Sequence, residues 1–244
     1  MKQNGVVIIT GAGGGLGSEI AAVAHEAGFP VALVGRTKAT LERLKKNLEQ
    51  RTPGGEKVSV HAVDLTKEKA THQEFARIAK NHGKIRALVN NAATWMGTTS
   101  IEKLSTAEIR ESLDLNFFSA VHASIATLKM TGSKPKGDLA IINVGATASL
   151  DAWMEVLPFS LAKGALRDFS RALGRSLGPS GVHVAHLVID GMLDNERTRK
   201  LNRSLPPNRF LKTRKVAESI FQVMMQDQSA WTMEWDIRPY NENW

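Results

Sequence analysis

The segment Val6–Gly17 reads VVIITGAGGGLG and joins a short apolar run to a glycine-rich stretch. Residues 6–10 have the continuous apolar character of a strand that is buried on both faces. The glycines that follow, within Thr10–Gly17, permit a tight turn and let backbone N–H groups approach a pyrophosphate. A helix is expected from there through Ala27, and its N-terminus would direct a partial positive charge toward that anion. This segment therefore predicts a strand–turn–helix unit that binds a dinucleotide.

Strand and helix patterns alternate along the rest of the chain. Strands are expected at residues 31–34, 58–63, 87–90, 139–144, 182–188 and 231–237, and helices at 39–50, 67–81, 106–130, 158–177 and 213–225. Such alternation favours a parallel sheet covered by helices on both faces. Because no linker or repeat divides the sequence, we predict one Rossmann-like, doubly wound α/β domain over residues 1–244, with about seven strands.

Composition narrows the classes of protein further. The chain of 244 residues contains no cysteine, which excludes disulfides and thiolate-bound metals. His183 and His186 lie on one expected strand at an odd separation, which places them on opposite faces, so no metal site is expected. No signal peptide pattern precedes the first strand, and no apolar run reaches the roughly 18 residues of a membrane span. We expect a cytoplasmic protein without membrane contact.

Positive charge is concentrated in one segment. Residues 195–215, the basic segment, hold eight lysines and arginines against one acid, Glu196, whereas the whole chain has a formal charge of only +8. The segment is either a solvated surface or a flap over an anionic ligand, and the sequence does not decide between these two. Nucleic acid is not an expected partner, because only Phe210 is interleaved with the basic residues and no nucleic-acid-binding motif is present.

Several motifs share their spacing with one known family. Gly11, Gly15 and Gly17 form the pattern TGxxxGxG, Asn90-Asn91-Ala92-Ala93 follows the fourth expected strand, and Leu115-Asn116 lies in a long helix. Asp64-Leu65 follows the third strand. Over essentially the whole chain, this combination resembles the short-chain dehydrogenase/reductase family, and the resemblance implies a nicotinamide cofactor and an oxidoreductase.

The resemblance also assigns residues to the cofactor. Those expected to bind it are Thr10, Gly11, Gly15, Leu16, Gly17, Arg36, Asp64, Asn91 and Lys163. An NAD site normally offers an acid to the ribose 2′-hydroxyl after the second strand, but this chain has none before Glu42. Arg36 stands there instead, and its planar guanidinium suits a 2′-phosphate. We therefore expect NADP(H) in preference to NAD(H).

The catalytic pattern of that family is incomplete. The family places a serine after the fifth strand, a tyrosine thirteen residues later, and a lysine four residues after the tyrosine. Aligning that lysine with Lys163 puts Phe159 at the tyrosine position and Ala146 at the serine position. Phenylalanine has no proton to give, and alanine cannot hydrogen-bond a carbonyl oxygen. Asn116 and Lys163 remain as expected catalytic residues of a divergent branch.

A replacement proton donor is not evident from the sequence. Thr147, Ser149 and a water held by Lys163 are candidates, whereas Tyr240, the single tyrosine, lies near the C-terminus. We expect an oxidoreductase of altered or weak catalysis that acts on a small molecule, and the basic segment leaves an anionic one as an open alternative. A catalytically inactive sensor or scaffold, and a lyase or isomerase, remain open. The resemblance further implies a homodimer or homotetramer that associates through the helices at 106–130 and 158–177.

Overall fold

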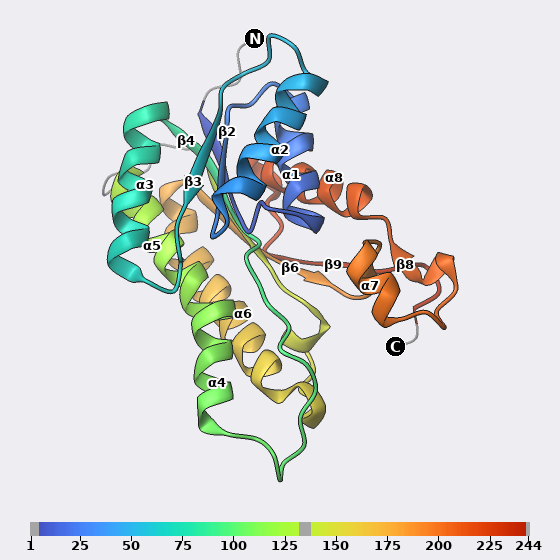
Figure 1. The fold of residues 1–244 in the computed structure, drawn as a ribbon. Coiled ribbons are helices and arrows are strands. Elements are labelled where there is room, and N and C mark those ends of the chain that lie inside the picture. The colour runs from blue at the N-terminus through green and yellow to red at the C-terminus, as the bar shows by residue number, and fades with distance from the viewer. Residues whose placement is uncertain (1–4, 132–137, 243–244) are drawn as a thin grey trace.

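A seven-stranded parallel sheet forms the centre of the molecule. The computed structural model describes residues 5–131 and 138–242, and the strands lie in the order β3-β2-β1-β4-β5-β6-β9 (Figure 1). All six neighbouring pairs are parallel. The strands are β1 (Val6–Thr10), β2 (Val31–Gly35), β3 (Val58–Ala62), β4 (Ile85–Asn90), β5 (Leu139–Val144), β6 (Val182–Ile189) and β9 (Glu234–Ile237). The chain reverses its direction of travel across the sheet between β3 and β4, which creates the crevice at β1 and β4 where such sheets bind ligands.

Helices cover both faces of this sheet (Figure 1). One apolar core joins the sheet to α1 (Gly15–Glu26), α2 (Lys38–Arg51) and α8 (Thr213–Met224). A second core joins the other face to α3 (Glu68–His82), α5 (Ser119–Thr131) and α6 (Leu157–Leu177). Every residue of β1, β5 and β6 is buried, as the apolar runs of their sequences predict. The predicted Rossmann-like single domain is confirmed.

The long helix predicted over residues 106–130 is present, but it contains a π-helical turn that the sequence did not predict. α4 (Thr106–Leu113) gives way to a π-helical segment, Asp114–Phe118, before α5 begins. Such a segment follows an i→i+5 hydrogen-bond pattern and is frequent at functional sites. Asn116, one of the expected catalytic residues, lies within it and is buried.

The basic segment adds small elements beyond the sheet. α7 (Glu196–Leu201) lies there, and β7 (Met192–Leu193) pairs in parallel with β8 (Phe210–Leu211) as a separate two-stranded sheet. These elements lie beside β6 and β9, at one end of the molecule (Figure 1). Among the residues described, no helix combines the length and apolarity that a membrane span requires.

Candidate functional site

The glycine-rich loop after β1 has space on its outer side and close contacts on its inner side. Gly11 and Gly15 have φ angles of +64° and +54°, a backbone conformation that favours glycine. A Cβ on Gly17 would lie 2.3 Å from the Gly11 carbonyl oxygen, so a side chain there would force the loop from helix α1. A Cβ on Gly14 or Gly15 would meet nothing within 4 Å. The loop therefore leaves room above the N-terminus of α1 that fits the pyrophosphate of a dinucleotide.

Thr10 and Asn91 connect this loop to the end of β4. The Thr10 hydroxyl accepts hydrogen bonds from the backbone N–H groups of Asn91, at 3.0 Å, and Ala92, at 3.1 Å. The Asn91 side-chain amide donates to the carbonyl oxygens of Thr10 and Gly11, at 3.1 and 3.3 Å. These two predicted cofactor residues thus hold the glycine-rich loop against the end of β4, at the crevice between β1 and β4.

Arg36 and Asp64 lie together at a cavity of about 130 Å³ beside the glycine loop, which Gly11 and Ala92 also line. Burial alone would raise the pKa of Asp64, but hydrogen bonds from the Thr66 side chain and backbone N–H, together with Lys67 and Arg36, lower it below its usual value. Asp64 is therefore an ionised acceptor. Arg36 is exposed at this cavity, where a phosphate could reach its guanidinium.

A larger cleft of about 810 Å³ begins at Gly15 and Leu16 and extends past the ends of β5 and β6. Lys163, Phe159 and Ala146 all line this cleft. The Lys163 Nζ lies 5.6 Å from the centre of the Phe159 ring. The structure thus brings together the three residues that the sequence alignment predicts at catalytic positions, and neither Ala146 nor Phe159 has a side-chain group that could transfer a proton.

Lys163 lines this cleft and is nevertheless buried, with 3% of its surface exposed. Its Nζ donates a hydrogen bond to the Val144 carbonyl oxygen at 2.8 Å, at the end of β5. Desolvation lowers the pKa of Lys163 to about 8. Burial disfavours the charged ammonium, so its proton is given up more readily than that of a surface lysine.

The other candidate proton donors are turned to different partners. Thr147 donates to an Asp190 carboxylate oxygen at 2.6 Å, and Ser149 donates to the Ala146 carbonyl oxygen. The Nε2 of the buried His186 lies 3.1 Å from the Ser149 hydroxyl, and desolvation together with Lys163 lowers the pKa of His186 to about 4. Neither Thr147 nor Ser149 lines the cleft. Tyr240 is 88% exposed and does not line it either.

Asn116 acts on the loop after β4 and does not itself line the cleft. Its side-chain oxygen accepts from the Thr94 N–H at 2.7 Å, and its amide donates to the Thr94 carbonyl at 3.1 Å and the Ser112 carbonyl at 3.0 Å. The π-helical segment therefore presents Asn116 to the backbone of Thr94. The next residue, Trp95, lines the cleft, so Asn116 is a positioning residue in this geometry.

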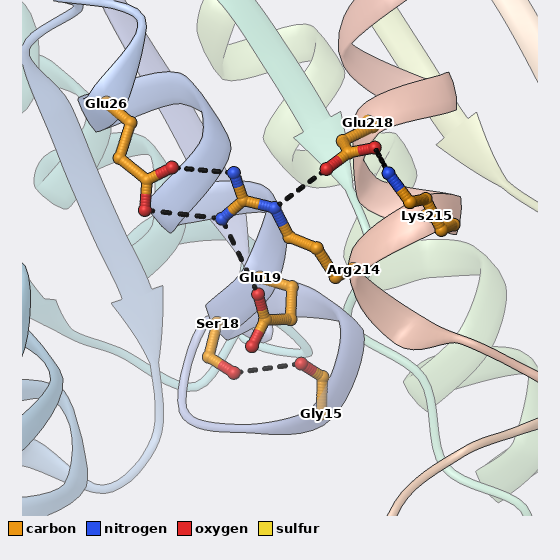
Figure 2. A network of polar contacts seen from close by, with 7 residues as sticks. All are labelled: Gly15, Ser18, Glu19, Glu26, Arg214, Lys215 and Glu218. Carbon is orange, nitrogen blue, oxygen red and sulfur yellow. Dashed lines mark hydrogen bonds and ion pairs between the residues drawn. The ribbon is translucent and has the colours of Figure 1, made fainter.

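Carboxylates neutralise most of the basic segment. Arg199 pairs with Asp194, Lys200 with Glu196 at 2.6 Å, and Arg209 with Glu242 at 2.8 Å. Arg214 and Lys215 belong to α8, where Figure 2 shows Arg214 between Glu26 and Glu19 of α1 and Glu218 of its own helix. The prediction of an electropositive flap thus needs refinement, because these pairs leave few cations for a ligand. Whether the segment moves stays a prediction.

Several residues around the cleft were not expected from the sequence. Trp95, Arg197 and Thr198 line it. None of these belongs to a motif with a known spacing. The position of Arg197 within a charged segment was the one available signal. His183 and His186 have separate partners, Thr232 and Ser149, and the described residues contain no group of three or more histidines and acids that could hold a metal ion.

Comparisons with known proteins agree with this fold. An uncharacterized oxidoreductase of Staphylococcus aureus is 26% identical over 234 residues, which cover 96% of each chain. The crystal structure of an actinorhodin polyketide ketoreductase with NADPH has a TM-score of 0.88 at 20% identity, covering 98% of this chain and 97% of that one. An NADPH-bound short-chain oxidoreductase from Pseudomonas aeruginosa, described as containing an atypical catalytic center, has a TM-score of 0.87 at 22% identity, with 98% and 96% covered.

The family itself follows from a match that spans most of the chain. The model of the short chain dehydrogenase family matches residues 5–205, which include the glycine loop, Asn91, Asn116 and Lys163. The chain therefore belongs to the short-chain dehydrogenase family of oxidoreductases, whose fold binds nicotinamide cofactors.

Proposed function

We propose that this protein is an NADP(H)-dependent oxidoreductase of a divergent branch, in which Lys163 replaces the missing tyrosine as proton donor. The observation that carries the proposal is the place of Lys163, which lines the cleft together with Ala146 and Phe159. The other acid-base side chains that line the cleft are Glu196 and Arg197, and Glu196 is paired with Lys200. Lys163 is thus the group best placed to transfer a proton.

NADPH, when bound, would supply the hydride for reduction of a carbonyl carbon. Thr10, Gly11, Gly15, Leu16, Gly17 and Asn91 would hold its pyrophosphate side, and Asp64 and Arg36 its adenosine side. Lys163 uses one ammonium hydrogen on the Val144 carbonyl, which leaves two for ligands in the cleft. The carbonyl oxygen would take a proton from this ammonium directly or through one water, and the neutral amine would regain a proton from solvent. The expected rate is low, because loss of a positioned acid costs on the order of 10²–10⁴ in rate.

The preference for NADP(H) rests on Arg36. A charge-assisted hydrogen bond to the 2′-phosphate is worth about 1.5–3 kcal/mol, so NADPH should bind more tightly than NADH by that amount. The test is a fluorescence titration of both cofactors, in which Arg36→Asp reverses the preference. Arg43→Asp is the control: it also reverses a charge, but Arg43 lies within α2 and does not line that cavity. Equal affinities in the unaltered protein would contradict the proposal.

A second candidate function is a sensor that binds NADP(H) without turnover. Phe159 and Ala146 favour it, since both remove a catalytic group. One experiment separates the two functions: NADPH binding is titrated, and then NADPH oxidation is followed with a panel of ketones, aldehydes and quinones. Binding together with oxidation supports the enzyme, and Lys163→Met should abolish the oxidation. Binding without oxidation across the panel supports the sensor.

We also propose that residues 195–215 close over the cleft when ligands bind. Asn195, Glu196, Arg197 and Thr198 line it, so their movement would change access. Saturating NADP+ should then slow limited proteolysis within the segment. Cleavage there at an unchanged rate, with NADP+ and with acidic carbonyl compounds, would contradict closure.

A further inference from the structure

Two cavities meet at Arg197. The cleft that contains Lys163 is one of them. The other has a volume of about 630 Å³ and lies between residues 95–97 and α7. Trp95, Glu196 and Arg197 line both. A bound molecule could therefore extend from Lys163 past Arg197 into the second cavity.

Arg197 has no carboxylate partner among the described residues, unlike most cations of the basic segment. Arg199, Lys200, Arg209, Arg214 and Lys215 each pair with an acid. Arg203 and Lys212 have no ion pair in the described part of the chain, but they line neither cavity. Within this segment, Arg197 thus combines an uncommitted guanidinium with a place at both cavities.

The charges around the two cavities favour an anion. The cations that line them are Lys163, Arg197 and Lys200, whereas Glu196 is the one carboxylate. Lys200 holds that carboxylate at 2.6 Å, on the same short helix. The guanidinium of Arg197 is therefore left with its donors for a ligand, and its planar fork matches a carboxylate.

Apolar side chains surround Arg197 on the side of the second cavity. Trp95 and Met96 are each 40% exposed, and Leu201 is 59% exposed. All three line this cavity. Exposed aromatic and aliphatic surface beside a free cation suits a molecule with an apolar body and an acidic group.

We propose that Arg197 determines substrate class by binding the carboxylate of an acidic carbonyl compound, whose apolar body packs on Trp95, Met96 and Leu201. This inference rests on the proposed function only in placing the carbonyl group at Lys163. The cofactor offers a second anion of related chemistry, because Gly15 and Leu16 line the same cleft as Arg197. The experiment must therefore separate a substrate carboxylate from the pyrophosphate.

Binding is measured to the protein saturated with NADP+, which has no hydride to give, so no turnover interferes. The probes are two acids with their neutral methyl esters: 4-carboxybenzaldehyde with methyl 4-formylbenzoate, and succinic semialdehyde with its methyl ester. Calorimetry gives each affinity. In the unaltered protein at least one acid should bind about ten- to a hundredfold more tightly than its ester, as expected for a charge-assisted hydrogen bond.

Arg197→Ala should remove this preference while the ester binds as before, and Arg197→Lys should restore part of it. Arg203→Ala is the matched control, an uncommitted cation of the same segment that lines neither cavity, and it should change nothing. The affinity for NADP+ should be the same in all variants. A loss of NADP+ affinity in Arg197→Ala that accompanies the loss of acid preference would assign Arg197 to the pyrophosphate and overturn the proposal. The proposal would also be overturned if neither acid bound the unaltered protein, or if neither bound more tightly than its ester.

These outcomes are distinguishable from failure of the proposed function. Acid preference through Arg197 without NADPH oxidation would contradict the enzyme and leave the binding site standing. Oxidation of NADPH with neutral carbonyl compounds, without acid preference, would support the enzyme and contradict the carboxylate site at Arg197.

Discussion

Lys163 carries a prediction about pH. Burial lowers its pKa to about 8 in the folded protein. If its ammonium supplies the proton, kcat/KM for NADPH-dependent reduction is constant at pH 6–7 and falls about tenfold per unit above about pH 8, where the amine is neutral. Lys163→Arg keeps a cation that does not titrate in this range, so its residual activity should lose that decline. A wild-type profile that stays flat to pH 10 would exclude Lys163 as the acid.

Phe159 and Ala146 carry a prediction about rate. Phe159 precedes Lys163 by one helical turn, so a tyrosine there would place its hydroxyl near the lysine ammonium. The double change Phe159→Tyr with Ala146→Ser should raise NADPH oxidation with small carbonyl compounds by about 10²–10⁴. Each single change should gain less, because groups that act as a unit are non-additive. Phe169→Tyr, which adds a hydroxyl to the same helix but outside the cleft, is the control. Robust wild-type turnover that the double change does not improve would show that the native site is complete.

The residues of the site differ in how far the sequence could predict them. Thr10, Asn91 and Lys163 belong to spaced motifs, and each lies at the expected crevice with identifiable partners. Thr147 and Ser149 were plausible donors because they neighbour Ala146, but their partners Asp190 and His186 come from strands or loops about forty residues later. Spacing along the chain carries no information about such pairings. Arg197 likewise becomes distinct only once the partners of its neighbours are known.

At the scale of elements, Arg214 joins α8 to α1. Its guanidinium contacts Glu26 at 2.6 Å, Glu218 at 3.1 Å and Glu19 at 3.8 Å (Figure 2). The hydrogen bond from Arg214 is the main cause that lowers the pKa of Glu26 below its ordinary value of 4.5. Because exposed pairs are worth 0.2–1 kcal/mol each, Arg214→Ala should reduce the free energy of unfolding by about 1 kcal/mol.

The pH dependence of that loss has a definite sign. Glu26 binds its proton less readily in the folded state, so the contact stabilises the fold above about pH 4.5 and is lost as the pH falls below it. Urea unfolding at pH 7 and pH 4 should therefore give a smaller difference between wild type and Arg214→Ala at the lower pH. Lys200→Ala removes one exposed pair within α7 and should cost no more than about 0.5 kcal/mol at either pH. A pH-independent difference for Arg214→Ala would contradict the electrostatic origin.

The order of elements was more predictable than their details. Apolar runs such as Leu139–Val144 identify buried strands directly, because all their residues face a covered sheet. The interruption of the helix at Asp114–Phe118 leaves no such pattern, since a π-helical segment shifts the apolar period by a fraction of a turn. Contacts such as Glu26 with Arg214 join residues 188 positions apart, and only the folded chain brings them together.

For the whole molecule, we predict association into a dimer or tetramer through α4, the π-helical segment, α5 and α6. Phe117 and Phe169 pack against each other with ring centres 6.2 Å apart, but Phe118 and Leu161 remain 40% and 43% exposed. Light scattering at micromolar concentration should give two or four times the monomer mass. Phe118→Glu with Leu161→Glu should shift it toward the monomer, whereas Ile101→Glu, an exposed apolar residue outside these helices, should not. A monomer mass for the unaltered protein would contradict this prediction.

The π-helical segment also sets a rotational phase. In a regular α-helix each residue turns the chain by about 100°, so one residue added or removed rotates everything beyond it by that angle. Asn116 hydrogen-bonds the backbone of Thr94 on one side, while beyond the segment α5 packs on the sheet and on α3 through Ala123 and Ala126. A regular helix through the same residues could satisfy one of these two alignments and would turn the other away. The π-helical turn therefore lets one helix both position the loop of the cofactor crevice through Asn116 and pack α5 correctly in the helix layer.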